Sequence, residues 1–240
     1  MARAPLLVEQ VQELIGETVY DPYGRVLGRL VSFESDVDGT VQRIVVENEY
    51  KDVSFYSSES VEIKDGRIIV WPEWKTLAFK VIASYQRAIK RLKGLEEMYS
   101  RGEIPGAVYH EIRKKLSKSL DQLKDEAKKL KEMITHRLHE IEDNNLKLDR
   151  AIANLKMSYL AGEISEKAYK TAIERLRSAK DSNTKEVEDL KSTRSRVESL
   201  ESGAFTKTEA KPAKAEEEKK EPTAAGIEGI QPIPVKLIEG

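Results

Sequence analysis

Cysteine is absent from the 240-residue sequence, and its absence removes several chemistries at once. Disulfide bonds, thiolate nucleophiles and zinc sites with sulfur ligands are all excluded. Glycine and proline number only 13 and 8, which excludes a collagen-like chain and a chain that is disordered throughout. The apolar runs are too short for a transmembrane helix, so we expect none.

Motifs of catalysis are also missing. The sequence has no phosphate-binding loop, nucleophile elbow or dinucleotide fingerprint, so we expect no enzyme, no catalytic residue and no cofactor. His136 and His139 lie one helical turn apart, a spacing that could bind a metal weakly. It is more typical of a solvated helix flank, and we expect no metal site. The N-terminal residues lack the apolar stretch of a signal peptide, which favours a cytoplasmic protein.

Charge is abundant but unevenly distributed. Charged residues form 35% of the chain and hydrophobic residues only 39%, which argues against one large globule. Residues 1–75 carry 8 basic and 14 acidic side chains, residues 105–200 carry 21 and 17, and residues 201–240 carry 6 and 8. The acidic ends and the basic middle can attract each other between copies, or the middle can hold a polyanion.

Residues 1–75 are predicted to form a small β domain. Turn signals such as Asp21–Gly24 and Asp65–Gly66 separate short runs that are rich in β-branched residues. The expected strands are Thr18–Tyr20, Arg25–Glu34, Val41–Glu47, Asp52–Tyr56, Ser60–Lys64 and Arg67–Trp71. Strands at this spacing favour a β-barrel, and a barrel this small has a marginal core that needs a partner or a second copy.

Residues 76–201 are predicted to be helical, because the apolar period changes and an internal repeat begins. Leu95, Tyr99, Gly102-Glu103-Ile104, Tyr109 and Leu116 recur at a constant offset of 60 as Leu155, Tyr159, Gly162-Glu163-Ile164, Tyr169 and Leu176. Each glycine can end a helix in the left-handed conformation. We therefore expect three helices, at about 76–101, 105–161 and 165–201, with breaks near 102 and 162. The alternative is one continuous helix that the glycines distort only locally.

The middle helix carries a coiled-coil seam. Its residues recur mostly at alternating steps of three and four, and the seam includes Leu123, Leu130, Ile134, Leu138, Ile141, Asn145, Leu148, Ile152 and Leu155. A polar residue such as Asn145 in a seam usually fixes the register of the helices. The last helix is shorter and carries polar Asn183 and Arg194 in its own seam. We therefore expect the seam to be covered by self-association into dimers and polymers.

The first helix has a basic stretch. Lys80, Arg87, Lys90, Arg91 and Lys93 meet no acidic residue before Glu96, and aromatic residues are interleaved with them. Basic helices with aromatic residues bind anionic membranes or nucleic acid. The alternative is the first helix of a coiled coil, with a solvated basic face and a core of Leu77, Val81, Tyr85, Leu92 and Tyr99.

The C-terminal part divides into a linker and a short apolar motif. Residues 202–229 have almost no apolar side chains, which predicts a disordered tether. Residues 230–240 regain apolar side chains, interrupted by Pro232 and Pro234. The prolines block one edge of an extended strand and leave the other free to join a partner's sheet. The alternative is a frayed C-terminus.

A family resemblance covers the whole chain. Residues 14–28, Leu-Ile-Gly-Glu-Thr-Val-Tyr-Asp-Pro-Tyr-Gly-Arg-Val-Leu-Gly, resemble the opening of a PRC-barrel domain. The order of barrel, coiled coil, polar tether and proline-containing apolar terminus resembles the CdvA family of archaeal cell-division proteins. The resemblance implies an α+β protein with an N-terminal PRC-barrel-like domain, a long helical coiled coil and a disordered C-terminal tail.

The resemblance also implies a function. Members of this family are non-catalytic scaffolds that polymerise at mid-cell on the inner face of the membrane. They recruit the ESCRT-III-like protein CdvB, whose winged-helix-like domain gains a strand from the C-terminal motif. The positions that correspond here are Ile230, Ile233, Val235, Leu237 and Ile238. Binding to anionic membranes, to DNA or at the nucleoid is also associated with the family.

Two other classes of function stay open at this point. One is a nucleic-acid-associated scaffold, for which a steep salt dependence of DNA binding would be diagnostic. The other is the regulatory subunit of a soluble enzyme, for which a tight small-molecule ligand of the barrel would be diagnostic.

Overall fold

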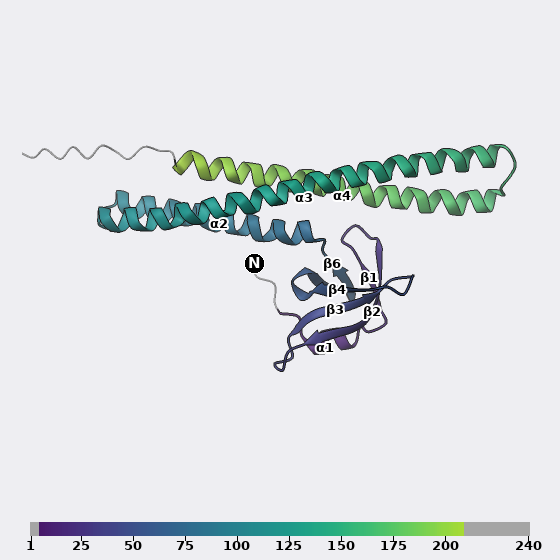
Figure 1. Ribbon diagram of the computed structural model, residues 1–240, viewed down its shortest axis with the longest axis horizontal. Coiled ribbons are helices and arrows are strands. Elements are labelled where there is room, and N and C mark those ends of the chain that lie inside the picture. Colours follow the sequence, from purple (N-terminus) through teal and green to yellow (C-terminus); the bar gives the residue numbers. More distant parts are fainter. Residues whose placement is uncertain (1–4, 209–240) are drawn as a thin grey trace, which may run out of the picture. The chain divides into compact units, whose positions relative to one another are not determined.

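Residues 5–208 are described by the structure, a computed structural model, with side chains described as far as residue 203 (Figure 1). The predicted motif at 230–240 and all but the first residues of the predicted tether lie outside this range. Within it, a short helix and six strands are followed by three long helices. The chain is therefore α+β, as the sequence predicts.

The N-terminal part is one six-stranded sheet preceded by α1 (Val8–Gln12). The strands run in the order β4-β3-β2-β1-β6-β5. Their bounds are β1 Thr18–Tyr20, β2 Val26–Ser35, β3 Val41–Glu47, β4 Val53–Ser57, β5 Val61–Lys64 and β6 Arg67–Val70. All six predicted strands are therefore present, with ends within one residue of the predictions.

A closed barrel is not confirmed. Within the described residues, β4 pairs only with β3 and β5 only with β6, so the sheet has two edges. The single turn of 3₁₀-helix at Ser58–Ser60 separates β4 from β5, and β5 then turns back onto β6. One face of the sheet still buries an apolar core with α1, formed by Val11, Val19, Leu30, Val41, Ile44, Val46, Val61, Ile68 and Val70.

Three helices follow: α2 (Glu73–Ser100), α3 (Gly106–Leu160) and α4 (Glu166–Thr208). The two breaks share one geometry, because Gly102 and Gly162 have φ values of 71° and 74°. The amide that follows each glycine donates back to a helix carbonyl, from Glu103 to Met98 at 3.0 Å and from Glu163 to Ser158 at 2.9 Å. These bonds satisfy carbonyls at the helix ends, so full turns form and the continuous-helix alternative is wrong.

Repeated tyrosines close both turns. Tyr99 stacks on Tyr109 with ring centroids 4.3 Å apart, and Tyr159 stacks on Tyr169 at 4.5 Å. The four tyrosines occupy equivalent positions of the sequence repeat, so the repeat encodes two equivalent helical hairpins.

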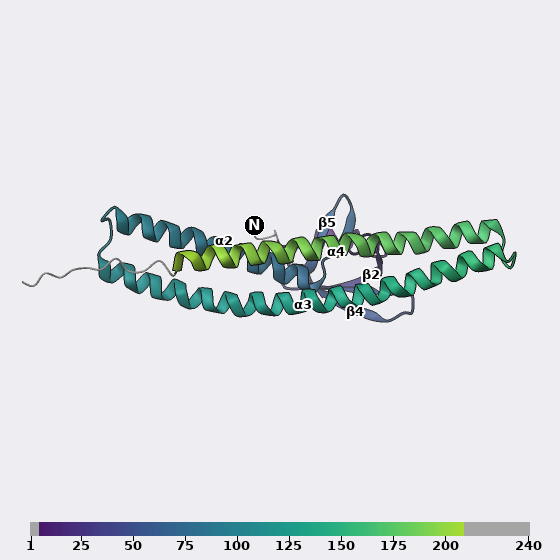
Figure 2. The same ribbon diagram turned by 90° about the horizontal axis from the view of Figure 1, so that it is seen from above.

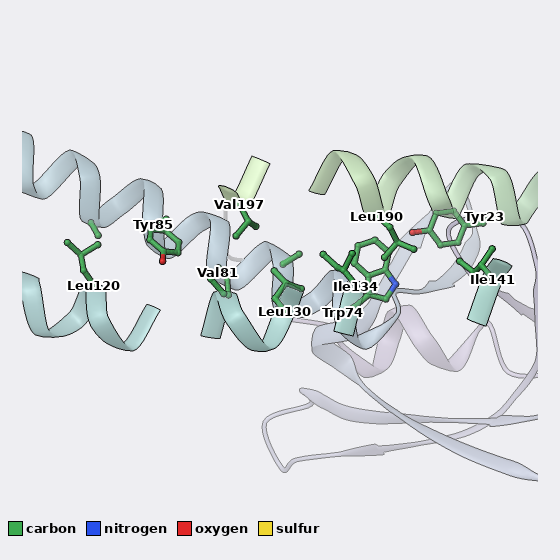
Figure 3. Packing of buried hydrophobic residues seen from close by; sticks show 13 residues of the cluster. Tyr23, Trp74, Val81, Tyr85, Leu120, Leu130, Ile134, Ile141, Leu190 and Val197 are labelled. Carbon is green, nitrogen blue, oxygen red and sulfur yellow. The ribbon is translucent and has the colours of Figure 1, made fainter. Parts of the chain in front are cut away.

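Two different helices cover α3. Figures 1 and 2 show α2 alongside its N-terminal half, while α4 returns along the C-terminal half and continues past the middle, where it lies beside α2. The shared core contains Trp74, Val81 and Tyr85 of α2, Leu120, Leu130, Ile134 and Ile141 of α3, and Leu190 and Val197 of α4 (Figure 3). Three helices therefore pack in the middle, and two at each end.

This arrangement corrects the reasoning behind the self-association seam. The sequence interpretation considered only the last helix as a cover within the chain and therefore invoked a second copy. In the structure, Leu130, Ile134 and Ile141 are at most 2% exposed in a single chain, because α2 covers what α4 does not. The middle of the seam therefore needs no second copy, whereas Leu148, Ile152 and Leu155 are only half buried, so self-association stays a prediction.

Candidate functional site

The β1–β2 turn connects the sheet to the helices. Asp21 shapes this turn, because its Oδ1 accepts hydrogen bonds from the amides of Tyr23 at 2.9 Å and Arg25 at 2.8 Å. The side chains of Tyr23 and Arg25 then extend to α4. This turn lies within the residues on which the PRC-barrel resemblance rests, and it anchors the sheet to α4.

Glu186 of α4 is the centre of this connection. It is 1% exposed and binds two arginines from different parts of the chain. Nη2 of Arg25 lies 2.6 Å from its carboxylate, and Nε of Arg137 in α3 donates to it at 2.7 Å. Burial alone would raise the pKa of Glu186, but hydrogen bonds from Arg137 and Arg25 outweigh it, and the pKa falls below its usual value. Glu186 is therefore an anion that holds the β1–β2 turn, α3 and α4 together.

A second polar contact lies one helical turn further along α4. The Tyr23 hydroxyl donates to Asp189 Oδ2 at 2.9 Å, and Lys75 at the start of α2 forms an ion pair with Asp189. Burial, followed by the charge of Asp189, raises the pKa of Tyr23, so its hydroxyl stays protonated and donates. Neither contact to Asp189 is visible in the sequence, because no local pattern relates residues that lie more than one hundred positions apart.

The predicted seam asparagine has a partner in the same chain. Asn183 Nδ2 of α4 donates to Asn145 Oδ1 at 2.8 Å, and Asn183 Oδ1 accepts from Arg25 at 3.1 Å. The polar residue that had suggested that the last helix was a poor cover is therefore matched to the polar residue of α3. Further along the pair of helices, Leu148, Ile152 and Leu155 are only half buried.

A cleft of about 1180 Å³ lies beside this connection. The sheet contributes residues from the β1–β2 turn, β2, β4 and β6, and the helices contribute the start of α2 and one face of α3. Five aromatic side chains line it: Tyr23, Phe55, Tyr56, Trp71 and Trp74. No local pattern in the sequence indicates this cleft, because the walls of the cleft come from separate segments.

The predicted basic residues of α2 share an exposed face. Lys80, Arg87, Lys90, Arg91 and Lys93 are all exposed, whereas Val81, Tyr85 and Leu92 on the same helix are buried. None of the five forms an ion pair with another residue of 5–208. Of the other two core residues that the coiled-coil alternative names, Leu77 is partly buried and Tyr99 is 45% exposed. The helix therefore has most of that apolar core and also displays the basic face that the binding hypothesis requires.

The remaining predicted site residues do not form a metal site or a membrane span within residues 5–208. His136 lies 3.3 Å from Glu140, but residues 5–208 contain no cluster of three or more histidine, aspartate or glutamate side chains that could hold a metal ion. In the same range, no helix combines the length and the apolar character needed to cross a bilayer. Ile230, Ile233, Val235, Leu237 and Ile238 lie outside the described residues.

Comparisons with known proteins agree on one family. The model of the CdvA-like coiled-coil domain matches residues 73–221, a range that begins at α2 and includes all three long helices. The chain is also similar to Cell division protein A of Sulfolobus acidocaldarius, with 35% identity over 232 residues that cover 96% of this chain and 97% of the relative. No solved structure matches the chain.

Proposed function

Because the chain belongs to the CdvA family of cell-division proteins, we propose that it is a non-catalytic scaffold that polymerises and recruits an ESCRT-III-like partner. The observation that carries the proposal is a long helical platform joined to a second, acidic domain. Helix α3 has 55 residues, which corresponds to about 80 Å at ~1.5 Å per residue. Glu186 fixes the sheet to this platform by ion pairs.

Recruitment is assigned to the C-terminal motif. Residues 209–229 connect it to the end of α4 and would let it sample a radius of roughly 25 Å, at about 5–6 Å × √n. The motif would add a strand to the winged-helix-like domain of CdvB, so that backbone hydrogen bonds give affinity and alternate side chains give specificity. The side chains in this role are Ile230, Ile233, Val235, Leu237 and Ile238.

Deletion of 230–240 tests this role. The truncated chain should lose capture of the CdvB C-terminal domain in a pull-down and should keep its sedimentation behaviour, because the deletion leaves the sheet and the helices intact. Val235→Asp with Leu237→Asp should act in the same way, while charge reversal at residues 216–218 serves as the control. Full capture by the truncated chain would remove the recruiting role.

Polymerisation is assigned to surfaces outside the helical core. The edge strand β4 exposes Val53 by 49% and Phe55 by 58%, and apolar side chains on a sheet edge favour pairing with another chain. The acidic sheet domain can also attract the basic helices of another copy. Val53→Lys should therefore reduce assembly in sedimentation and electron microscopy without unfolding the chain. A wild-type chain that stays monomeric at high concentration would contradict the proposal.

The basic face of α2 supports a second candidate role, binding to anionic membranes at mid-cell or to DNA at the nucleoid. Exposed lysines and arginines without acidic partners bind phosphates and release counterions. Changing Lys90, Arg91 and Lys93 to Glu should weaken binding to anionic liposomes or DNA at low salt and leave the fold intact. If binding is unchanged, the basic residues serve only as the solvent-exposed face of the helix.

A further inference from the structure

The cleft between the sheet and α3 has the lining of a peptide-binding groove. Trp71 is fixed in its wall, because its Nε1 donates to Glu62 at 2.8 Å and its ring meets the Phe79 ring edge-on at 5.4 Å. Trp74 is 4% exposed, whereas Phe55 is 58% exposed on β4. The groove therefore combines rigid aromatic walls with one exposed aromatic residue at its edge.

Acidic residues stand among the lining side chains. Glu73 at the start of α2 and Glu132 of α3 both line the cleft and are exposed. Neither forms an ion pair with another residue of 5–208. An occupant with a positive charge beside its apolar residues would complement this lining.

We propose that this cleft binds residues 230–238 of the same chain. The segment reads Ile-Gln-Pro-Ile-Pro-Val-Lys-Leu-Ile. Proline-containing segments favour an extended conformation that costs little entropy to fix, and aromatic-lined grooves recognise them. Ile233 lies between Pro232 and Pro234, Val235 follows them, and Lys236 supplies the positive charge that Glu73 and Glu132 can meet.

The length of the intervening chain permits this docking. Glu186 of α4 lines the cleft, and α4 ends 22 residues later at Thr208, about 33 Å away at ~1.5 Å per residue. A segment of the length of residues 209–229, 21 residues, spans up to roughly 70 Å when extended, at ~3.3 Å per residue, and a flexible coil of the same length would span about 25 Å. A tether of this length gives a local concentration in the millimolar range, so even a weak groove would be occupied.

This docking goes beyond the proposed function and does not depend on who the partner is. A segment held in the cleft cannot add a strand to another protein at the same time. The apparent affinity of any partner for the segment would then fall by the fraction of time that the segment is free. The cleft would keep the segment masked until a partner with an open sheet edge competes for it.

The two tryptophans of the chain report directly on the cleft. Trp71 and Trp74 are the only tryptophans in the sequence, and both line it. The intact chain is compared with a chain that ends at residue 229, by emission maximum and by acrylamide quenching. We expect the truncated chain to emit at longer wavelength and to be quenched more strongly. A synthetic peptide of residues 228–240, added to the truncated chain, should restore the emission of the intact chain with saturation.

Two matched substitutions on β4 distinguish an effect on the cleft from a general effect on the sheet. Phe55→Ala should lower the affinity for the peptide by tenfold or more, because it removes an exposed wall of the groove. Val53→Ala, on the same strand and 49% exposed, does not line the cleft and should bind the peptide normally. A peptide with Lys236→Glu should bind at least several-fold more weakly. Circular dichroism verifies that the variants remain folded.

Two results would overturn the proposal. One is identical fluorescence of the intact and truncated chains together with no response to millimolar peptide. The other is a fluorescence difference that disappears on dilution of the intact chain, which would place the segment in the cleft of a second copy rather than its own. A signal that is independent of protein concentration supports docking within one chain.

Discussion

The two halves of α3 are packed by different chemistry. On the side of α2, the core consists of apolar and aromatic residues, and the buried hydroxyl of Tyr85 has no hydrogen-bond partner within residues 5–208. On the side of α4, two buried polar residues bind α3: Asn183 pairs with Asn145, and Glu186 pairs with Arg137. Apolar contacts depend little on direction, whereas hydrogen bonds and ion pairs do. The half of α3 beside α2 is therefore stabilised mainly by buried apolar surface. The half beside α4 fixes the register of the two helices and the position of the sheet against them.

Among the substitutions that test this contrast, Glu186→Gln is expected to change the free energy of unfolding most. The change leaves Arg25 and Arg137 without their shared anion, and loss of one partner of a buried ion pair costs about 3–5 kcal/mol. We expect about 3 kcal/mol, because both arginines remain partly exposed to water. Urea unfolding measures the loss, and Glu188→Gln, at an exposed position of the same helix, is the control. A loss below about 0.5 kcal/mol, the range of ordinary surface substitutions, would show that the polar half does not depend on Glu186.

The pH dependence of stability should identify the same carboxylate. The folded-state pKa of Glu186 lies below its ordinary value of 4.5, so its stabilising contribution is present above about pH 4.5 and is lost as the pH falls through the folded-state pKa. The stability difference between the wild type and Glu186→Gln should therefore shrink below pH 4.5. The measurement is the free energy of unfolding of both proteins from pH 7 downward. A difference that stays constant would assign the effect to packing instead of charge.

A smaller effect is expected at the asparagine pair. Asn145→Leu alone leaves the buried Asn183 amide without this partner, which should cost about 1–3 kcal/mol. Changing both residues to Leu should recover most of that stability, because no unpaired amide remains, but should weaken the register of α3 against α4. Thermal unfolding measures the first effect, and cysteines introduced for cross-linking between the two helices measure the second. Equal losses in the single and double variants would indicate that the two amides are not coupled.

The smallest change in the free energy of unfolding, and one of opposite sign, is expected from a substitution at Tyr85 on the apolar half. Burial raises the pKa of Tyr85 to about 12, with a further contribution from Glu201, and its hydroxyl has no partner within residues 5–208. Tyr85→Phe removes this unpaired group and keeps the ring, so the stability should be unchanged or increase by up to about 1 kcal/mol. A clear loss in thermal unfolding would reveal a hydrogen bond of the hydroxyl and weaken the contrast between the halves.

Several elements could be predicted because they depend on neighbouring residues alone. Gly102 and Gly162 end helices because glycine, which lacks a side chain, adopts the left-handed conformation without strain. The strands follow from alternation between turn signals, and the basic face of α2 follows from helical spacing. Asn145 and Asn183 are both visible in the sequence as polar residues in apolar seams. Their pairing depends on the antiparallel register of α3 and α4, which the seams alone do not specify.

Local sequence specifies the helices, strands and turns of this chain and the period of the α3 seam, since each is encoded within a few turns of helix or a few residues of strand. Folding alone settles which helix covers which part of α3, brings Arg25 to Glu186 and gathers five aromatic residues at one cleft. These contacts cannot be read locally because they join residues between a few dozen and about 160 positions apart. Their partners are selected by geometry and by the cost of leaving a buried charge unpaired, and neither is visible in a local pattern.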